Sequence, residues 1–289
     1  MKSRGVKTFN AINVLLMLII LFICLFPFIY MFSLSFSSPK AVINGKVLFY
    51  PVDINIQAYK TIVEYPSFFT AYRNTVFYTV AGTGISMLMT LLFAYPLSKS
   101  YLKGTKLIMR FVIVSMFFTG GLIPNYLVVS WLKLTDKVWA ILIPFAINQF
   151  NLIILISFLR NIPESLEEAA MIDGMNYFGI LFKIVLPLSL PAIATVSLYC
   201  AVFFWNDWFY GLMYLNSTEL YPVMLFLRNI VKGSSIVGSA SGSGAADKTT
   251  ISITIKSAAI ILTTVPIMCL YPFLQKYFVK GMVLGSVKG

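Results

Sequence analysis

Histidine is absent from this sequence of 289 residues, and cysteine occurs only three times. Histidine is the commonest metal ligand and general base in proteins, so its absence removes the usual centre of metal or acid–base chemistry. Cys24, Cys200 and Cys269 each lie inside an apolar run, and no two of them have the spacing of a metal site. We therefore predict buried, inert thiols, no metal site and no catalytic residue.

Charge is also scarce, at 11% of residues, against about 25% in a typical soluble domain. Hydrophobic residues make up 59% of the chain, more than a water-soluble fold of this size can bury. The net charge is +12, but Lys and Arg are spread between apolar runs and form no dense patch. This spread argues against nucleic-acid binding and favours basic residues that flank membrane spans, in contact with lipid.

Long intervals without charge predict six membrane-spanning helices. Each interval is long enough for the ~20 residues that cross the hydrocarbon core, and backbone groups in lipid must be satisfied within the helix. A strand barrel would need shorter segments of alternating polarity, which the chain lacks. The expected fold is an all-α integral membrane protein with a single transmembrane domain over residues 1–289. The expected spans are 10–35, 73–98, 108–131, 138–160, 184–211 and 254–275.

Six spans place both termini on one side of the membrane. The basic cluster from Lys99 to Arg110 favours the cytoplasm for that side, by the excess of Lys and Arg in cytoplasmic loops. Outside, a short helix is expected from about Asn55 to Glu64. The outer loop 212–253 carries an apolar piece too short to span, Leu220–Leu227, followed by a Gly/Ser-rich stretch from Gly233 that we expect to be flexible.

The loop 161–183, between the fourth and fifth expected spans, predicts a compact helix–turn–helix. Asn161 can cap a helix, Pro163 suits its first turn, and acidic residues favour its positive N-terminal end. Gly174 can take the left-handed conformation that ends a helix. The segment has almost no basic residue before Lys183, unlike helices that lie on lipid headgroups. We therefore expect a protein partner with basic groups; a headgroup-bound linker is the alternative.

This segment resembles the EAA motif of bacterial ABC-importer permeases. The landmarks are Glu168-Ala169-Ala170, Asp173-Gly174, Ile184, Leu186-Pro187 and Pro191. In that family the motif forms a coupling helix that docks into a cleft on a cytoplasmic ATPase. The resemblance therefore implies the type I ABC importer permease fold. It also implies ATPase-coupling roles for Glu167, Glu168, Ala169, Ala170, Asp173 and Gly174.

The rest of the chain resembles the MalG-like permeases of carbohydrate importers. The tail Phe273–Gly289 is part of this resemblance. Two stretches are most similar to a subgroup assigned to aldouronate, alginate and pectic oligosaccharides: Phe117–Leu127 and Trp205-Asn206-Asp207-Trp208-Phe209. The resemblance implies a homologous second permease chain, two ATPase subunits, an external sugar-binding protein and the bacterial cytoplasmic membrane. No Gly-x-x-x-x-Gly-Lys-Ser/Thr loop occurs, so ATP and Mg²⁺ are expected only on the ATPases and no cofactor in this chain.

Polar and aromatic residues within the spans are the expected sugar path, because sugars stack on aromatic faces and hydrogen-bond to amides and carboxylates. For the tryptophans, an interfacial belt is an equal alternative. Asp207 would repel an acidic sugar unless it is paired or faces elsewhere. The candidates are Asn125, Tyr126, Asn148, Gln149, Trp205, Asn206, Asp207 and Trp208.

Two other classes of transporter stay open. An ion-coupled secondary transporter would show internal repeats and ionisable groups along an ion path, and the sequence has neither a clear repeat nor a carboxylate chain. An ABC permease for a solute other than sugar shares the EAA core. An intramembrane enzyme is disfavoured, because no nucleophile–base pair is available without histidine.

Overall fold

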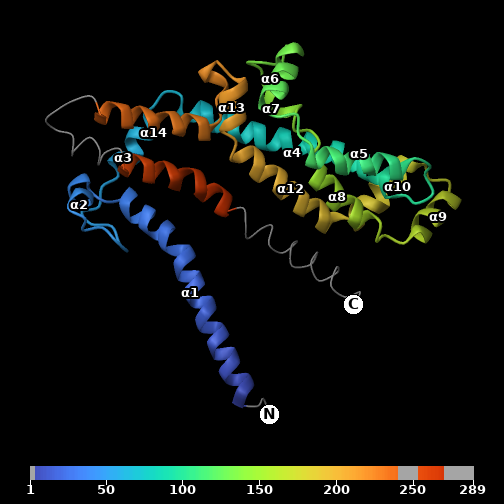
Figure 1. The fold of residues 1–289 in the computed structure, drawn as a ribbon, viewed down its shortest axis with the longest axis horizontal. Coiled ribbons are helices and arrows are strands. Elements are labelled where there is room, and N and C mark those ends of the chain that lie inside the picture. Colours follow the sequence, from blue (N-terminus) through green and yellow to red (C-terminus); the bar gives the residue numbers. More distant parts are fainter. Residues whose placement is uncertain (1–3, 240–252, 270–289) are drawn as a thin grey trace. The chain divides into compact units, whose positions relative to one another are not determined.

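The computed structural model describes residues 4–239 and 253–269, and within these ranges the chain is helical and contains no strand (Figure 1). The all-α fold class is confirmed. The chain divides into two compact units, each described by itself. The first takes residues 1–68 and 227–266, and the second takes residues 69–226 and 267–289. The tail 273–289 and the Gly/Ser residues 240–244 lie outside the described residues.

The first unit contains the longest apolar helix. Its helix α1 is apolar enough to cross a membrane over Phe9–Ser35, and almost all of its large side chains there are exposed. The short helix expected near Asn55 is confirmed as α3, and Tyr59 on it hydrogen-bonds to Ser35 Oγ at 2.8 Å. The helices of this unit are α1 (Arg4–Ser35), α2 (Pro39–Ile43), α3 (Gln57–Val63), most of α14 (Val223–Ser239) and most of Ile253–Cys269.

The second unit is built around α4, a helix of 31 residues, Phe68–Ser98. Its C-terminal half packs with several other helices into a core in which Ala94, Leu155 and Ala192 are fully buried. The remaining elements are α5 (Thr105–Phe117), α6 (Leu122–Trp131), α7 (Trp139–Leu142), α8 (Gln149–Leu159), α9 (Glu164–Ile172), α10 (Tyr177–Ile180), the π-helical turn η1 (Leu181–Val185), α11 (Leu186–Leu188), α12 (Leu190–Trp205), α13 (Phe209–Tyr214) and η2 (Thr218–Leu220).

Three of the expected spans are broken helices, which corrects the expectation of continuous ones. Helices α5 and α6 meet at 115°, where Gly121 adopts φ 84°, a conformation that side-chain-bearing residues rarely take. Residues 138–160 divide into α7 and α8 around Pro144, which lacks a backbone donor. The fifth segment bends by 84° at Ser189, which lies between Pro187 and Pro191.

Within residues 4–239 and 253–269, two helices, α1 and α4, are long and apolar enough to span a membrane, and the number rises to four if each of the two bent pairs is one span. Two shorter apolar helices, α8 and Ile253–Cys269, fall on the fourth and sixth expected spans. The expected span boundaries stay a prediction.

Two local expectations are wrong. The outer stretch expected to be flexible from Gly233 is helical as far as Ser239, because α14 continues through it at a cost of only ~1 kcal/mol for a glycine. Cys24 and Cys269 are exposed, and only Cys200 is buried, because the first two lie on outward faces of apolar helices.

Candidate functional site

The EAA segment forms helix α9, which starts directly after Pro163 and ends at a left-handed Gly174 with φ 82°. The left-handed conformation predicted for Gly174 is confirmed, and its ATPase-coupling role stays a prediction. The predicted cap is not confirmed: the Asn161 amide donates back to the Ser157 carbonyl at 2.9 Å. A second short helix, α10, follows, and Asn176 caps it by accepting from the Gly179 amide at 2.7 Å.

Helix α9 presents a mixed apolar and acidic face to solvent. Glu168 and Asp173 are exposed beside three apolar side chains, and Ile172 is 86% exposed. Single exposed apolar residues are common, but an exposed apolar group at one end of a unit, rimmed by acids, is typical of a protein-binding surface. We call this surface the α9 face; its residues are Leu166, Glu168, Ala169, Met171, Ile172 and Asp173.

Glu167 and Ala170 point the other way, into the unit. Glu167 is only 4% exposed, and its carboxylate forms an ion pair with Lys99, which directly follows α4. The Tyr95 hydroxyl donates to the same carboxylate at 3.1 Å. The Lys99 ammonium lies 4.9 Å from the centre of the Tyr95 ring, within cation–π range. Glu167 therefore joins α9 to Tyr95 of α4 and to Lys99 directly after it.

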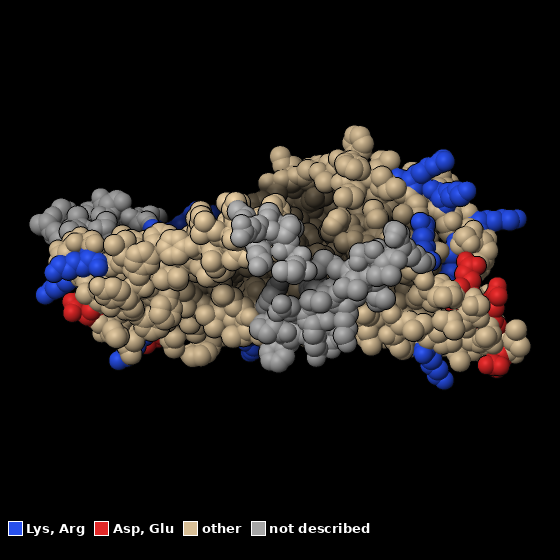
Figure 2. All heavy atoms as spheres, turned by 90° about the horizontal axis from the view of Figure 1, so that it is seen from below, with Lys and Arg blue, Asp and Glu red and all other residues tan. Residues whose placement is uncertain are grey.

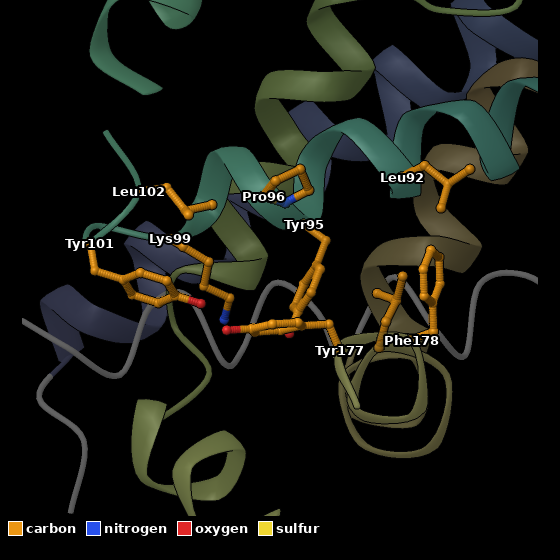
Figure 3. A pocket seen from close by; sticks show the side chains of 9 residues that line it. Leu92, Tyr95, Pro96, Lys99, Tyr101, Leu102, Tyr177 and Phe178 are labelled. Carbon is orange, nitrogen blue, oxygen red and sulfur yellow. The ribbon is translucent and has the colours of Figure 1, made fainter. Parts of the chain in front are cut away.

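An apolar pocket of about 350 Å³ lies between the end of α4 and α10. Figure 3 shows Tyr95 and Lys99 leaving α4 on one side, toward Tyr177 of α10. Burial raises the pKa of the Tyr101 phenol, and Tyr177 and the carboxylates of Glu167 and Glu164 raise it further. Figure 2 shows acidic and basic side chains together at the end of this unit that carries α9 and α10.

A larger cavity of about 580 Å³ lies deeper in the second unit. Its walls come from α4, α6, α8, α12 and α13 and from the irregular segments between them. Its polar lining consists of amides and hydroxyls, and no charged side chain is among the described residues that line it. The lining residues are Ser86, Thr119, Asn125, Pro144, Phe145, Ile147, Asn148, Gln149, Phe150, Asn151, Tyr199, Cys200, Phe203, Phe204 and Tyr210.

Aromatic rings form one wall of this cavity. The Phe145 ring centre lies 4.3 Å from that of Tyr210 and 5.1 Å from that of Phe203. The Phe150 and Tyr199 rings are 6.4 Å apart. Such faces stack on the apolar faces of sugar rings, and the neighbouring amides can donate and accept hydrogen bonds. The cavity is therefore suited to the ring faces and hydroxyl groups of a ligand.

Three of the expected sugar-path residues line this cavity: Asn125, Asn148 and Gln149. Asn148 also caps α8, because its side-chain oxygen accepts a hydrogen bond from the Asn151 backbone amide at 3.1 Å. Tyr126 lies outside the lining and stacks on Tyr214.

The cluster 205–208 does not line the cavity. Trp205 is buried and meets the Tyr72 ring edge-on at 6.2 Å, while the Asn206 amide donates to the Val202 carbonyl at 3.0 Å. Trp208 is 37% exposed and packs on its neighbour in sequence.

Asp207 is a helix cap. Its two carboxylate oxygens accept from the backbone amides of Tyr210 and Gly211, at 3.0 and 3.1 Å, at the start of α13. The residue is 7% exposed, and it is not among the residues that line the cavity. In the structure the Asp207 carboxylate is paired with backbone donors, which is one of the arrangements that the sequence left open for it.

Sequence reasoning missed two groups of residues. Lys99 was interpreted only as part of the basic cluster that follows a membrane span, and no neighbouring residue in the sequence indicates that it pairs with Glu167. The aromatic wall, with Phe145, Tyr199 and Tyr210, could not be separated from the many other aromatic residues in the spans. The one available signal was an aromatic residue beside Pro144, a residue type that interrupts helices.

Comparison with known proteins identifies the family. Residues 4–284 match the family model of the binding-protein-dependent transport system inner membrane component. The chain is 46% identical to the polygalacturonan/rhamnogalacturonan transport system permease protein YtcP of Bacillus subtilis (strain 168), over 92% of this chain and 93% of that protein. It is 40% identical to protein LplC of the same organism, over 99% and 97% of the two chains.

A solved structure is similar over nearly the whole length. It is the crystal structure of a bacterial ABC transporter involved in the import of the acidic polysaccharide alginate. The TM-score is 0.85 at 35% identity, with 96% of this chain and 99% of that chain covered. The chain therefore belongs to the family of binding-protein-dependent transport system inner membrane components.

Proposed function

We propose that this chain is one permease subunit of an ATP-driven importer that carries oligosaccharides across the bacterial cytoplasmic membrane by alternating access. The observation that carries the proposal is the α9 face. An exposed apolar and acidic helix, ended by Gly174 and held to the end of a 31-residue spanning helix, is a docking element for a cytoplasmic partner. A chain without a phosphate-binding loop needs such a partner to use ATP.

The partner on the α9 face is an ATPase subunit that carries ATP and Mg²⁺. A cleft with basic and apolar residues would complement Glu168 and Asp173 and receive Ile172, which is 86% exposed. Closure of two ATPases on ATP would move α9 and tilt the helices attached to it. The full assembly then contains a homologous second permease chain and an external binding protein. In this topology α9 and both termini lie on the cytoplasmic side.

The proposed cargo is an oligosaccharide that contains uronate units. The aromatic wall and the amides of Asn125, Asn148 and Gln149 suit sugar rings and hydroxyls. An amide N–H also donates to a carboxylate, so this lining accepts an acidic sugar without a fixed cation. Acidic cargo is supported by two similar proteins, a permease of a polygalacturonan/rhamnogalacturonan transport system and a transporter involved in alginate import.

The test is uptake by the reconstituted assembly. The chain is co-expressed with its partner permease and ATPase, placed in proteoliposomes with ATP inside, and given the binding protein with labelled oligogalacturonate or a neutral oligosaccharide outside. We expect ATP-dependent accumulation that a protonophore leaves unchanged. Accumulation driven by an ion gradient without ATP would contradict the proposal and favour a secondary transporter.

A further inference from the structure

The junction between α9 and the inner end of α4 is held by several polar contacts. The buried Glu167 carboxylate forms an ion pair with the Lys99 ammonium and accepts a hydrogen bond from the Tyr95 hydroxyl. Around it, Ser100 Oγ donates to Glu164 at 3.3 Å, and the Arg160 guanidinium donates to the Leu97 carbonyl at 3.4 Å. We call the group Tyr95, Lys99 and Glu167 the clasp.

The outer end of α4 is tied just as closely to the segment 219–223, which leads into α14. The side-chain amide of Asn74 donates to the Glu219 carbonyl at 2.6 Å and to the Tyr221 carbonyl at 3.2 Å. The Tyr78 hydroxyl donates to the Leu220 carbonyl at 2.9 Å. Thr75 Oγ1 accepts from the Val223 amide at 2.7 Å. These bonds attach α4 to three consecutive carbonyls and the first amide of the outer helix.

One continuous helix joins the two attachments. At 1.5 Å per residue, the 31 residues of α4 extend about 45 Å, more than the hydrocarbon thickness of a bilayer. Pro96 lies within this helix, directly after Tyr95 and before Lys99. A helix is stiff along its axis, so a displacement applied at Tyr95, on the Thr75 side of the proline, reaches Thr75 with little loss. The other described spans beside it, α5 with α6 and α10 with α12, are bent at breaks of 115° and 84°.

We propose that Glu167, Lys99 and Tyr95 are positioning residues that clasp the coupling helix to α4, and that α4 carries the displacement of α9 to the outer segment 219–223. The inference rests on the proposed function, since it assigns a route to the motion that an ATPase would impart. It gives the two adjacent glutamates separate tasks: Glu168 meets the partner, and Glu167 transmits the motion.

Stability alone does not explain a charge pair at this place. Apolar residues of similar volume stabilise a buried site as well as an ion pair does, or better. A carboxylate that receives an ammonium and a phenol from one helix fixes the direction as well as the distance of α9. Direction is the property that a transmitting joint requires.

The experiment measures uptake and ATP hydrolysis together in proteoliposomes that contain the complete assembly. For Glu167→Gln we expect the ATPase to remain bound and hydrolyse ATP, while oligosaccharide uptake per ATP falls about tenfold, within the range usual for coupling between two sites. The charge-swapped double variant, Lys99→Glu with Glu167→Lys, restores the ion pair and should recover most of the oligosaccharide uptake per ATP. Glu64→Gln, which neutralises an exposed carboxylate at the end of α3, should leave the ratio unchanged.

A single substitution leaves one buried charge unpaired and can impair folding. The double variant Lys99→Met with Glu167→Gln leaves no charge behind and keeps the side-chain volume. It should assemble normally and still show the fall in uptake per ATP. Wild-type uptake per ATP in this double variant overturns the clasp, as does loss of the bound ATPase from it. Failure of the wild-type assembly to take up sugar with ATP would instead overturn the proposed function.

Discussion

Adjacent residues on α9 have opposite environments. Successive residues of a helix point about 100° apart, so Glu167 faces the unit while Glu168 faces solvent. The first is 4% exposed and paired with Lys99. The second has no hydrogen bond or ion pair among the contacts of the described residues. Its carboxylate is thus free for a partner chain, and charge reversal there tests docking alone.

Glu168→Lys should leave the chain in the membrane and remove ATP-driven uptake. If the pair with the ATPase is desolvated, losing one partner costs about 3–5 kcal/mol, and if it is exposed the cost is about 0–1 kcal/mol. The measurement is retention of the ATPase on the purified permease, together with uptake by proteoliposomes. Normal uptake by Glu168→Lys would show that the α9 face is not the docking surface.

Gly82 on α4 marks the closest approach of α12. A Cβ added there would lie 2.6 Å from ring atoms of Phe204, a side chain that is 2% exposed. Gly82→Ala should lower the free energy of unfolding by about 1–3 kcal/mol through overpacking. Thermal unfolding in detergent measures the loss.

Gly84→Ala is the matched control, since it lies on the same helix and its added Cβ meets nothing within 4 Å. It should be neutral or stabilising by up to about 1 kcal/mol, because alanine favours helix. Equal melting temperatures for the two variants would contradict the packing of α4 on α12.

Asp136 ties the loop before α7 to residues 216 and 217. Its carboxylate accepts from the amides of Asn216 and Ser217 and from the Ser217 hydroxyl, at 2.6–2.9 Å. These bonds, led by the Ser217 hydroxyl, lower the pKa of Asp136. A lowered pKa means that the stabilisation is complete above the unfolded-state value of about 3.9 and is lost as pH falls through the folded-state pKa.

We therefore expect the backbone amides of Asn216 and Ser217 to be protected from hydrogen exchange at neutral pH, relative to their intrinsic exchange rates, and to lose that protection once the pH drops below about 4. Hydrogen exchange of the purified chain, corrected at each pH for the intrinsic rate, measures this. Asp136→Asn removes the titrating group, so the protection of these amides should show no acid-dependent step. An identical step in both proteins would assign the change to another group.

Among the helical elements, two of the three broken spans have their breaks at the cavity, and the break at Ser189 lies elsewhere. Non-helical backbone at membrane depth is tolerated where it lines a cavity or is covered by protein. Thr119 between α5 and α6, Asn148 between α7 and α8, and Tyr210 near the start of α13 all line the cavity of about 580 Å³. The breaks thus expose backbone and polar side chains at the place where a sugar would pass.

Gln149→Leu should weaken oligosaccharide transport without disturbing the fold. Gln149 lines the cavity and caps no helix, so the loss is one ligand hydrogen bond, about 1 kcal/mol. The sugar-bound binding protein should then be needed at about five times the concentration for half-maximal uptake. Tyr126→Phe, outside the lining, is the control and should leave this value unchanged. A larger effect from Tyr126→Phe would place the sugar path elsewhere.

At the scale of the whole molecule, the chain exposes more apolar surface than a free-standing protein can. In the most apolar part of α1, within Phe9–Ser35, 0% of the residues are buried against the rest of the described chain. Lipid and the proposed second permease chain can cover such surfaces, and the α9 face is the proposed docking site for an ATPase subunit. The chain is thus one part of a larger membrane assembly, as its family membership requires.

Affinity purification of the tagged chain from native membranes in mild detergent should recover a second multi-span permease and an ATPase, identified by mass spectrometry. Both partners together support the proposed assembly. Recovery of the chain alone, or as a homo-oligomer, under several gentle conditions would contradict it and favour the ion-coupled carrier.

The amino-acid sequence was sufficient to predict the helical class, the position of the apolar segments, the turn at Gly174 and the absence of an ATPase loop. These features depend on composition and on residues a few positions apart, so periodicity and backbone preference are sufficient to predict them.

Only the tertiary structure decided the roles of individual side chains. Glu167 and Lys99 lie 68 positions apart, and no local pattern pairs them. The same holds for the cavity, which brings together Asn125, Gln149 and Tyr199 while it leaves Trp205 and Asp207 outside. Which face of a helix is buried, and against what, is set by packing between distant segments, and packing is a property of the folded chain.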